Sequence, residues 1–77
     1  MKTLKEIPIG RAARVLAVGG GGALRHRLLD MGITPGTLIT VRKAAPLGDP
    51  LELTLRGYSL TIRKEDAARI GVEEVAV

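Results

Sequence analysis

Residues 51–63 read L-E-L-T-L-R-G-Y-S-L-T-I-R, and they carry the clearest structural pattern in the chain. Apolar and polar residues alternate from Leu51 to Leu55 and again from Tyr58 to Arg63. Alternation with a period of two is typical of strands with one buried face. Between the two runs, Arg56-Gly57 is a two-residue turn, because glycine readily supplies the positive φ that such turns require. The stretch therefore predicts an antiparallel hairpin.

Upstream of the hairpin, the sequence predicts two more strands with a helix between them. The strands span residues 11–18 and 37–43, and the helix spans residues 23–31 after a run of four glycines. Leucines and a methionine at i, i+4 and i+7 give this helix one buried stripe, and Gly32 is suited to end it in a left-handed conformation. Three residues of the segment 44–50 are Pro or Gly, so we expect no regular structure there.

Downstream of the hairpin, residues 64–70 predict a short helical turn that ends at Gly71. Val72, Val75 and Val77 predict a closing strand. The chain is thus expected to be mostly β: a Src-homology-3-like, five-stranded small barrel with one inserted helix and a short helical turn. Residues 1–77 form a single domain in this prediction, and closure of the barrel leaves no free strand edge.

The composition is that of a small chain with an aliphatic core. It has 77 residues, no cysteine and one aromatic residue, and 45% of its residues are apolar. A domain of this size buries only about 60% of the surface that its unfolded chain exposes. No apolar run approaches the ~20 residues of a membrane span, and charges at Lys5 and Glu6 interrupt the start of the chain. We expect a soluble, cytoplasmic protein without direct membrane insertion.

Neither catalysis nor a nucleotide cofactor is expected. The glycine run 19–22 is followed by Ala23-Leu24, so it lacks the Lys and hydroxyl residue of a P-loop and the third glycine of a dinucleotide motif. With one histidine and no cysteine, no nucleophile–base pair can be assigned. The sequence predicts no enzyme, no catalytic residue and no cofactor.

Two other chemistries stay open as alternatives. His26 and Asp30 lie four residues apart on the exposed helix face, so they are candidate ligands for weak binding of a divalent transition metal. A net charge of +4 makes nucleic-acid binding by a small basic barrel the alternative function. A single tyrosine supplies no base-stacking platform, however, and we expect no nucleic-acid partner.

The segment 44–50 is the most informative surface feature. Leu47 stands between Pro46 and Gly48 in a loop that should be exposed. An apolar side chain on a proline-stiffened loop can enter a groove of a partner at low entropic cost. The alternative is that Leu47 folds back onto the barrel.

Three runs of sequence resemble one known family. They are L-R-H-R-L-L-D-M-G-I-T-P-G-T (24–37), A-P-L-G-D-P-L (45–51) and R-G-Y-S-L-T-I-R-K-E-D-A (56–67). In this order they resemble segments of the FeoA proteins, small cytoplasmic components of the bacterial and archaeal ferrous iron uptake system. The resemblance covers essentially the whole chain, and it implies the same Src-homology-3-like barrel.

The resemblance also implies a function and a partner. It implies a non-enzymatic accessory role in ferrous iron uptake, through binding to the FeoB-type permease, whose cytoplasmic part carries a GTPase domain. The protein would be recruited to the inner face of the membrane by this partner. A similar domain also occurs at the C-terminus of metal-dependent repressors, where it is fused to a helix-turn-helix region for which 77 residues leave no room. A regulatory domain related to such repressors is the second alternative function.

The partner-binding surface is expected on the exposed side of the helix and on the proline loop. The chain has no Gln and no Arg that stands out as a finger, so a structural or gating role is favoured over assistance to GTP hydrolysis. The oligomeric state is left open. The predicted contact residues are Arg25, Leu29, Pro46, Leu47 and Asp49.

Overall fold

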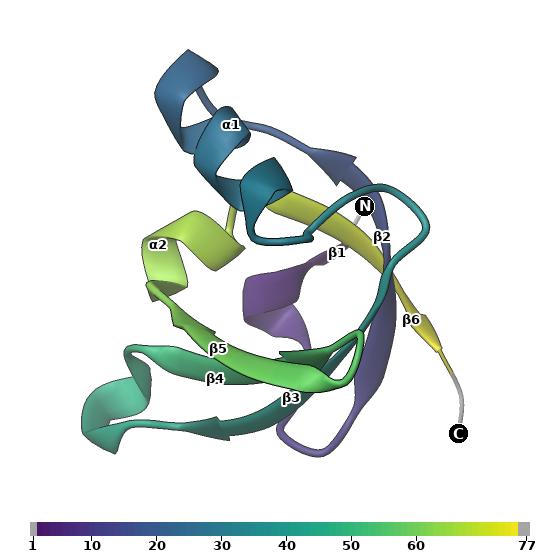
Figure 1. The fold of residues 1–77 in the computed structure, drawn as a ribbon. Coiled ribbons are helices and arrows are strands. Elements are labelled where there is room, and N and C mark those ends of the chain that lie inside the picture. Colours follow the sequence, from purple (N-terminus) through teal and green to yellow (C-terminus); the bar gives the residue numbers. More distant parts are fainter. Residues whose placement is uncertain (1, 76–77) are drawn as a thin grey trace.

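One curled antiparallel sheet forms the body of the molecule (Figure 1). The structure is a computed structural model that describes residues 2–75. The strand order is β1-β6-β2-β3-β4-β5. The strands are β1 (Lys2–Thr3), β2 (Ala12–Val18), β3 (Leu38–Ala44), β4 (Leu51–Leu55), β5 (Tyr58–Ile62) and β6 (Ile70–Val75). The α-helices are α1 (Gly22–Asp30) and α2 (Lys64–Ala67), and the 3-10 helices are η1 (Leu4–Glu6) and η2 (Pro46–Gly48).

The β4–β5 hairpin has the predicted register and turn. Leu55 pairs with Tyr58 across the turn. Both turn residues have positive φ, 50° at Arg56 and 84° at Gly57. Two-residue turns with positive φ at both positions match the right-handed twist of the flanking strands. The hairpin prediction is confirmed.

Helix α1 ends as the sequence predicts, at a glycine with positive φ. Gly32 has a φ of 93°. Its N–H bonds the carbonyl of Leu29 at 3.0 Å, and the N–H of Ile33 bonds the carbonyl of Leu28 at 3.1 Å. These two bonds form a Schellman motif, and the buried side chains of Ile33 and Leu28 supply its usual apolar contact. The motif fixes the direction in which the chain leaves α1.

The N-terminal segment contributes structure that the sequence analysis did not predict. β1 pairs with β6, and η1 follows it at once. Leu4 of η1 is fully buried and Ile7 is nearly so. The charged residues between them hide the apolar spacing, and a two-residue strand is too short to show a period. The described sheet therefore has six strands, within the expected fold class.

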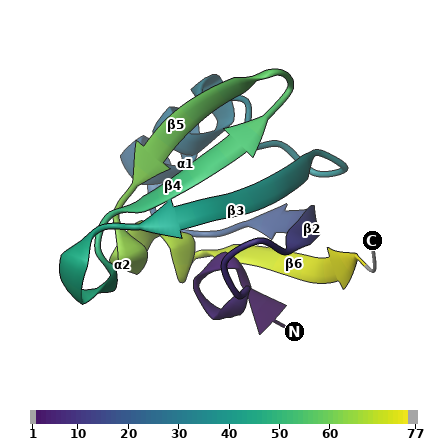
Figure 2. The ribbon, with the colours of Figure 1, turned by 90° about the horizontal axis from the view of Figure 1, so that it is seen from below.

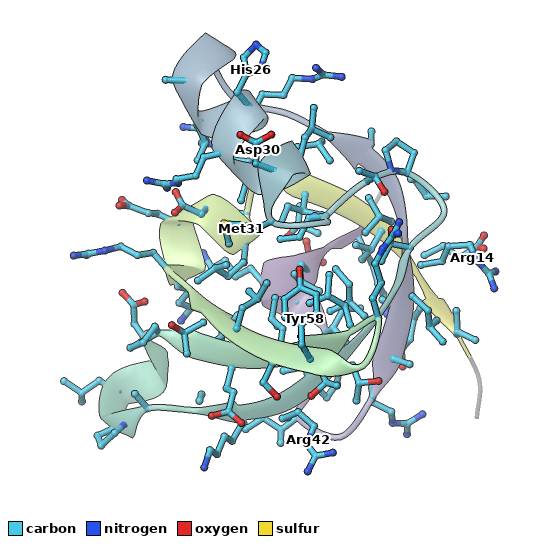
Figure 3. All side chains as sticks on the ribbon, in the orientation of Figure 1. Arg14, His26, Asp30, Met31, Arg42 and Tyr58 are labelled. Atoms are coloured by element: carbon cyan, nitrogen blue, oxygen red, sulfur yellow. The ribbon has the colours of Figure 1, made fainter. Side chains whose placement is uncertain are left out.

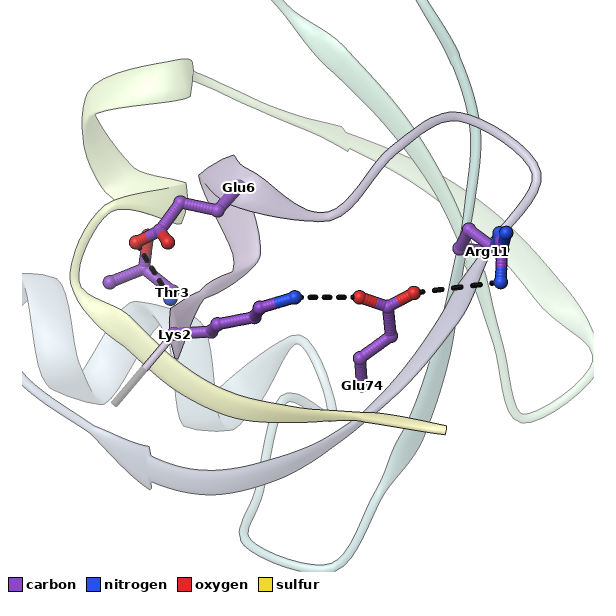
Figure 4. A network of polar contacts seen from close by, with 5 residues as sticks. All are labelled: Lys2, Thr3, Glu6, Arg11 and Glu74. Carbon is purple, nitrogen blue, oxygen red and sulfur yellow. Dashed lines mark hydrogen bonds and ion pairs between the residues drawn. The ribbon is translucent and has the colours of Figure 1, made fainter. Parts of the chain in front are cut away.

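Polar contacts hold this segment in place (Figure 4). The backbone N–H and the hydroxyl of Thr3 both donate to Oε1 of Glu6 at 3.2 Å, which caps η1. Nζ of Lys2 donates to Oε1 of Glu74 on β6 at 2.8 Å. Arg11 approaches the other carboxylate oxygen of Glu74 at 3.7 Å. The first and last strands are thus joined by charge as well as by backbone pairing.

The C-terminal part differs in detail from the prediction. Helix α2 stops at Ala67, and Ile70 and Gly71 already belong to β6. Gly71 pairs with Thr3 of β1 and is buried, so it lies inside a strand and does not end a helical turn. Val72 is buried in this strand, while Val77 of the predicted closing strand lies outside the described residues.

The core is aliphatic, as the composition predicts. Buried side chains from every strand except β1, from η1 and from both α-helices meet in one cluster. Its largest fully buried members are Leu4, Leu28, Ile33, Ile39, Leu53, Leu55 and Ile70. Among residues 2–75, no helix is long and apolar enough to cross a membrane.

The sheet does not close through hydrogen bonds, in contrast to the expected closed barrel. β1 and β5 are its two outermost strands, and each has one pairing neighbour in the described chain. Figure 2 shows β5 at one margin of the sheet with α1 behind it. The outer edge of β5 therefore has no pairing strand among residues 2–75.

Candidate partner-binding surface

The η2 loop, residues 45–50, is a rigid projection between β3 and β4. The N–H of Ala45 bonds the carbonyl of Pro50 at 3.0 Å, and the N–H of Gly48 bonds the carbonyl of Ala45 at 2.8 Å. Oδ1 of Asp49 accepts a bond from the N–H of Lys64, the first residue of α2, at 2.9 Å. The loop is therefore fastened at its base and to a neighbouring helix.

Leu47 stands at the tip of this loop, and its side chain is 100% exposed. Its backbone lies in the left-handed region, with a φ of 70°. This conformation costs a residue with a side chain roughly 1–2 kcal/mol relative to the right-handed one. Of the two readings of Leu47, the structure shows the exposed one. Backbone strain of this kind occurs at functional sites more often than elsewhere.

The other two predicted loop residues differ in role: Pro46 is free to contact a partner, whereas Asp49 holds the loop in place. Pro46 is exposed beside Leu47 and fixes the entry to the 3-10 turn. Asp49 is also exposed, but its carboxylate is engaged with the backbone of α2. Truncating Asp49 would free the loop from α2 as well as change the surface.

The two predicted residues of α1 are less free than those of the loop. Nε of Arg25 donates to the carbonyl of Val18 at 3.3 Å, across the glycine run. Leu29 is half-buried and packs against the core. Figure 1 places α1 and the η2 loop in different parts of the molecule, with α2 between them. The structure therefore presents the predicted contact residues as two separate regions.

The candidate metal ligands lie on the outer side of α1. His26 and Asp30 are both exposed, and Figure 3 shows them along the same helix. In residues 2–75, no three His, Cys, Asp or Glu side chains gather closely enough to hold a metal ion. Two exposed ligands on one helix do not supply the three or four protein ligands of a tight site.

Arg27, Arg42 and Arg56, which could contact nucleic-acid phosphates, do not form one patch. Arg27 is paired with Asp66 at 2.8 Å, and Arg56 donates to the hydroxyls of Thr34 and Thr37 at 3.0 and 2.9 Å. Figure 3 shows Arg42 on the far side of the molecule from α1. A groove that follows a phosphate backbone needs converging cations, and these point in different directions.

A pocket that the sequence analysis missed lies between α1 and the β5–α2 corner. Its volume is about 400 Å³. The Arg27–Asp66 ion pair joins α1 to α2 beside it, and the hydroxyl of Tyr58 donates to the carbonyl of Met31 (Figure 3). Its lining residues are Arg27, Leu28, Met31, Thr61, Ile62, Arg63, Glu65 and Asp66. No sequence pattern indicates this pocket, because its walls lie 30 or more residues apart in the chain.

The fold and the exposed loop define a small β-barrel module whose accessible features are suited to binding. The family model described as the FeoA domain matches residues 2–74. This chain therefore belongs to the FeoA family, which is associated with ferrous iron transport.

Known proteins support this assignment. The Fe(2+) transport protein A/Fe(2+) transporter FeoB fusion protein of Porphyromonas gingivalis is 41% identical over 73 residues, which are 95% of this chain and 9% of that protein. This chain thus spans less than a tenth of the length of the fusion protein.

Two solved structures are similar over nearly the whole chain. The FeoA-like protein from Clostridium acetobutylicum has 40% identity and a TM-score of 0.89, with 97% of this chain and 87% of that chain covered. The FeoA of Stenotrophomonas maltophilia, solved in complex with zinc and described as a prokaryotic SH3 domain protein, has 26% identity and a TM-score of 0.83. The match covers 95% of this chain and 91% of that one. The predicted Src-homology-3-like fold class is confirmed.

Proposed function

We propose that this protein is a non-enzymatic accessory of ferrous iron uptake that binds the cytoplasmic part of a FeoB-type permease. The observation that carries the proposal is the fully exposed Leu47, held in a left-handed conformation by a fastened loop. Burying one leucine side chain contributes about 1.5–3 kcal/mol, and a rigid loop loses little entropy on docking. Leu47 and Pro46 form the main contact, and Arg25 and Leu29 on α1 form a second contact region.

The fusion protein of Porphyromonas gingivalis supports the choice of partner. There, a FeoA-like segment and a FeoB transporter belong to one chain. Covalent linkage supplies an effective concentration of the order of millimolar, so even a weak contact is occupied. A separate chain has no such linkage, and its affinity has to come from its own surface.

The role in this proposal is structural or gating. The protein binds the permease at the inner face of the membrane and shifts the balance between its conformations. Such a shift requires that the protein bind one conformation more tightly than the other. Binding measured with and without guanine nucleotide reports this difference.

The Leu47 contact can be tested by titrating the detergent-solubilised FeoB-type permease with wild-type protein and Leu47→Asp. We expect the variant to fold normally, because the side chain touches nothing, and to bind at least tenfold more weakly. Ile9→Asp is the matched control, since Ile9 is also an exposed aliphatic residue, outside the loop. It should bind like the wild type.

A second variant separates binding from folding. Glycine adopts a positive φ without strain, so Leu47→Gly should raise the free energy of unfolding by about 1 kcal/mol while it weakens binding. Unchanged affinity in both Leu47 variants would remove the loop from the interface. If the wild-type protein does not bind the permease in any nucleotide state, at concentrations up to hundreds of micromolar, the proposed function is contradicted.

A further inference from the structure

The outer edge of β5 carries backbone groups with no partner in the described chain. Leu55 and Tyr58 flank a two-residue turn, so they form a hydrogen-bonded pair. Such pairs alternate with non-bonded ones along an antiparallel ladder, so Leu60 and Ile62 also bond to β4. The N–H and C=O groups of Ser59 and Thr61 consequently point outward. Within residues 2–75 no loop or turn bonds them, and both residues are exposed.

The two outermost strands, β1 and β5, differ in how well their own residues prevent pairing with another chain. β1 has only two residues, one of which is Lys2, and such short, charged strands resist pairing with other chains. β5 is Tyr-Ser-Leu-Thr-Ile, with no charge, no proline and no glycine. Every residue type in it except serine and leucine favours strands, so β5 itself carries none of the charged or proline residues that commonly protect an edge strand.

Recognition features adjoin the free edge at its C-terminal end. Thr61, Ile62 and Arg63 form one wall of the 400 Å³ pocket, and Leu28 and Met31 of α1 lie across from them. Arg63 is exposed and makes no ion pair with any residue from 2 to 75. An extended peptide on this edge would therefore meet backbone donors and acceptors, then a pocket whose lining includes Glu65 and the Arg27–Asp66 ion pair, and then the Arg63 guanidinium.

We propose that the free edge of β5 receives an extended, acidic strand of the permease. Its backbone pairs with Ser59 and Thr61, and one of its carboxylates meets Arg63. In strand addition of this kind, main-chain bonds supply affinity and a side-chain pocket supplies specificity. The inference rests on the proposed function and adds a second surface, distinct from the Leu47 loop.

Hydrogen exchange measures the proposed pairing without any mutation. In the free protein, the amides of Ser59 and Thr61 should exchange fast, while those of Tyr58, Leu60 and Ile62 are protected by β4. With the detergent-solubilised permease bound, mass spectrometry of a peptide over residues 56–63 should show two further protected amides. Binding without this added protection would overturn the edge proposal and leave the proposed function intact.

A pair of variants at one position tests the same bond by affinity. Proline is tolerated on edge strands where its missing N–H would face outward, so Thr61→Pro should keep the hairpin and weaken permease binding at least tenfold. Thr61→Val keeps the N–H and should bind like the wild type. If Thr61→Pro unfolds, the exchange experiment on the wild type decides alone. Equal affinity of a folded Thr61→Pro would contradict the proposal.

Charge and self-association complete the test. Arg63→Gln should weaken binding about threefold to tenfold, whereas the control Arg42→Gln, at another exposed arginine, should not. A concentration-dependent dimer that Thr61→Pro abolishes would show that a second copy of this chain occupies the edge, which would overturn the proposal. No permease binding by the wild type would contradict the proposed function and this inference together.

Discussion

Gly32 shows how much one position depends on backbone conformation and on its surroundings together. Its φ of 93° favours glycine, and this requirement follows from the end of the helical pattern in the sequence. A Cβ at Gly32 would also lie 2.9 Å from the hydroxyl of Tyr58, which donates to the carbonyl of Met31. The sequence predicts the first requirement, whereas the second arises only because β5 packs beneath α1.

We expect Gly32→Ala to lower the free energy of unfolding by about 2 kcal/mol. Roughly 1 kcal/mol comes from the left-handed backbone, and about as much from the displaced Tyr58 hydrogen bond. Gly36→Ala is the control, because Gly36 has a φ of 92° and open space around its Cβ position. Urea denaturation should give it the smaller loss. Equal losses of stability in Gly32→Ala and Gly36→Ala would contradict this account. So would a difference between these two losses that stays the same when both variants are made in a Tyr58→Phe background.

Leu47 marks the limit of reasoning from single residues. Its neighbours Pro46 and Gly48 predict a loop, and a loop is what the structure has. Whether a leucine in a loop faces solvent or the core depends on what packs beside it. The sequence therefore allows both an exposed Leu47 and one folded onto the barrel, and the structure shows the exposed one. Its role as a partner contact stays a proposal.

Among the elements, η1 and the short strand before it have structure that their own sequence does not indicate. A period of two needs several residues to appear, and β1 has two. Leu4 and Ile7 are buried because the segment fills one end of the barrel and pairs with β6. The longer elements were predicted well: the hairpin and α1 each contain a full pattern, and the strands before and after α1 lie within one residue of their predicted bounds.

The importance of η1 can be measured by truncating its buried leucine. Leu4→Ala should lower the free energy of unfolding by about 2–5 kcal/mol, through lost burial and the cavity left behind. In a domain this small, such a loss leaves much of the protein unfolded at 37 °C. Ile9→Ala is the control, since Ile9 is 61% exposed, and it should change stability by less than about 0.5 kcal/mol. A small effect of Leu4→Ala would mean that the N-terminal segment is dispensable.

At the scale of the whole molecule, the Lys2–Glu74 pair ties the first strand to the last. The hydrogen bond between the two side chains, and then their Coulombic attraction, lower the pKa of Glu74 and raise the pKa of Lys2. The Glu74 contribution to stability is present above its unfolded pKa and lost as the pH falls through its folded pKa. The Lys2 contribution is lost as the pH rises through its raised pKa.

This linkage predicts a window between the ordinary pKa values of 4.5 for Glu and 10.5 for Lys. Inside it, Glu74→Gln should be slightly less stable than the wild type, and the difference should vanish as the pH falls below this window. The effect is small because Lys2 is exposed and Glu74 is only partly buried, and 1 M salt should reduce it further. Urea midpoints measured across pH test this. If the stability difference between the wild type and Glu74→Gln persists at acidic pH, its cause is lost packing and not the ion pair.

Local sequence patterns are enough to predict the individual elements and the class of fold. Alternation, turn chemistry and helix capping act over a few neighbouring residues, so the hairpin, α1 and its end at Gly32 can be read from the chain. Resemblance along three ordered runs placed the chain in its family, which the family model over residues 2–74 confirms.

The position of the open edge of the sheet, and the residues that lie beside it, follow from packing across the whole molecule. The free edge of β5, the pocket beside it and the separation of α1 from the η2 loop depend on contacts between residues far apart in the chain. Local patterns fix which face of an element is apolar, but not which other element covers it. Packing makes that choice, because it is settled by the shapes and volumes of all the elements at once.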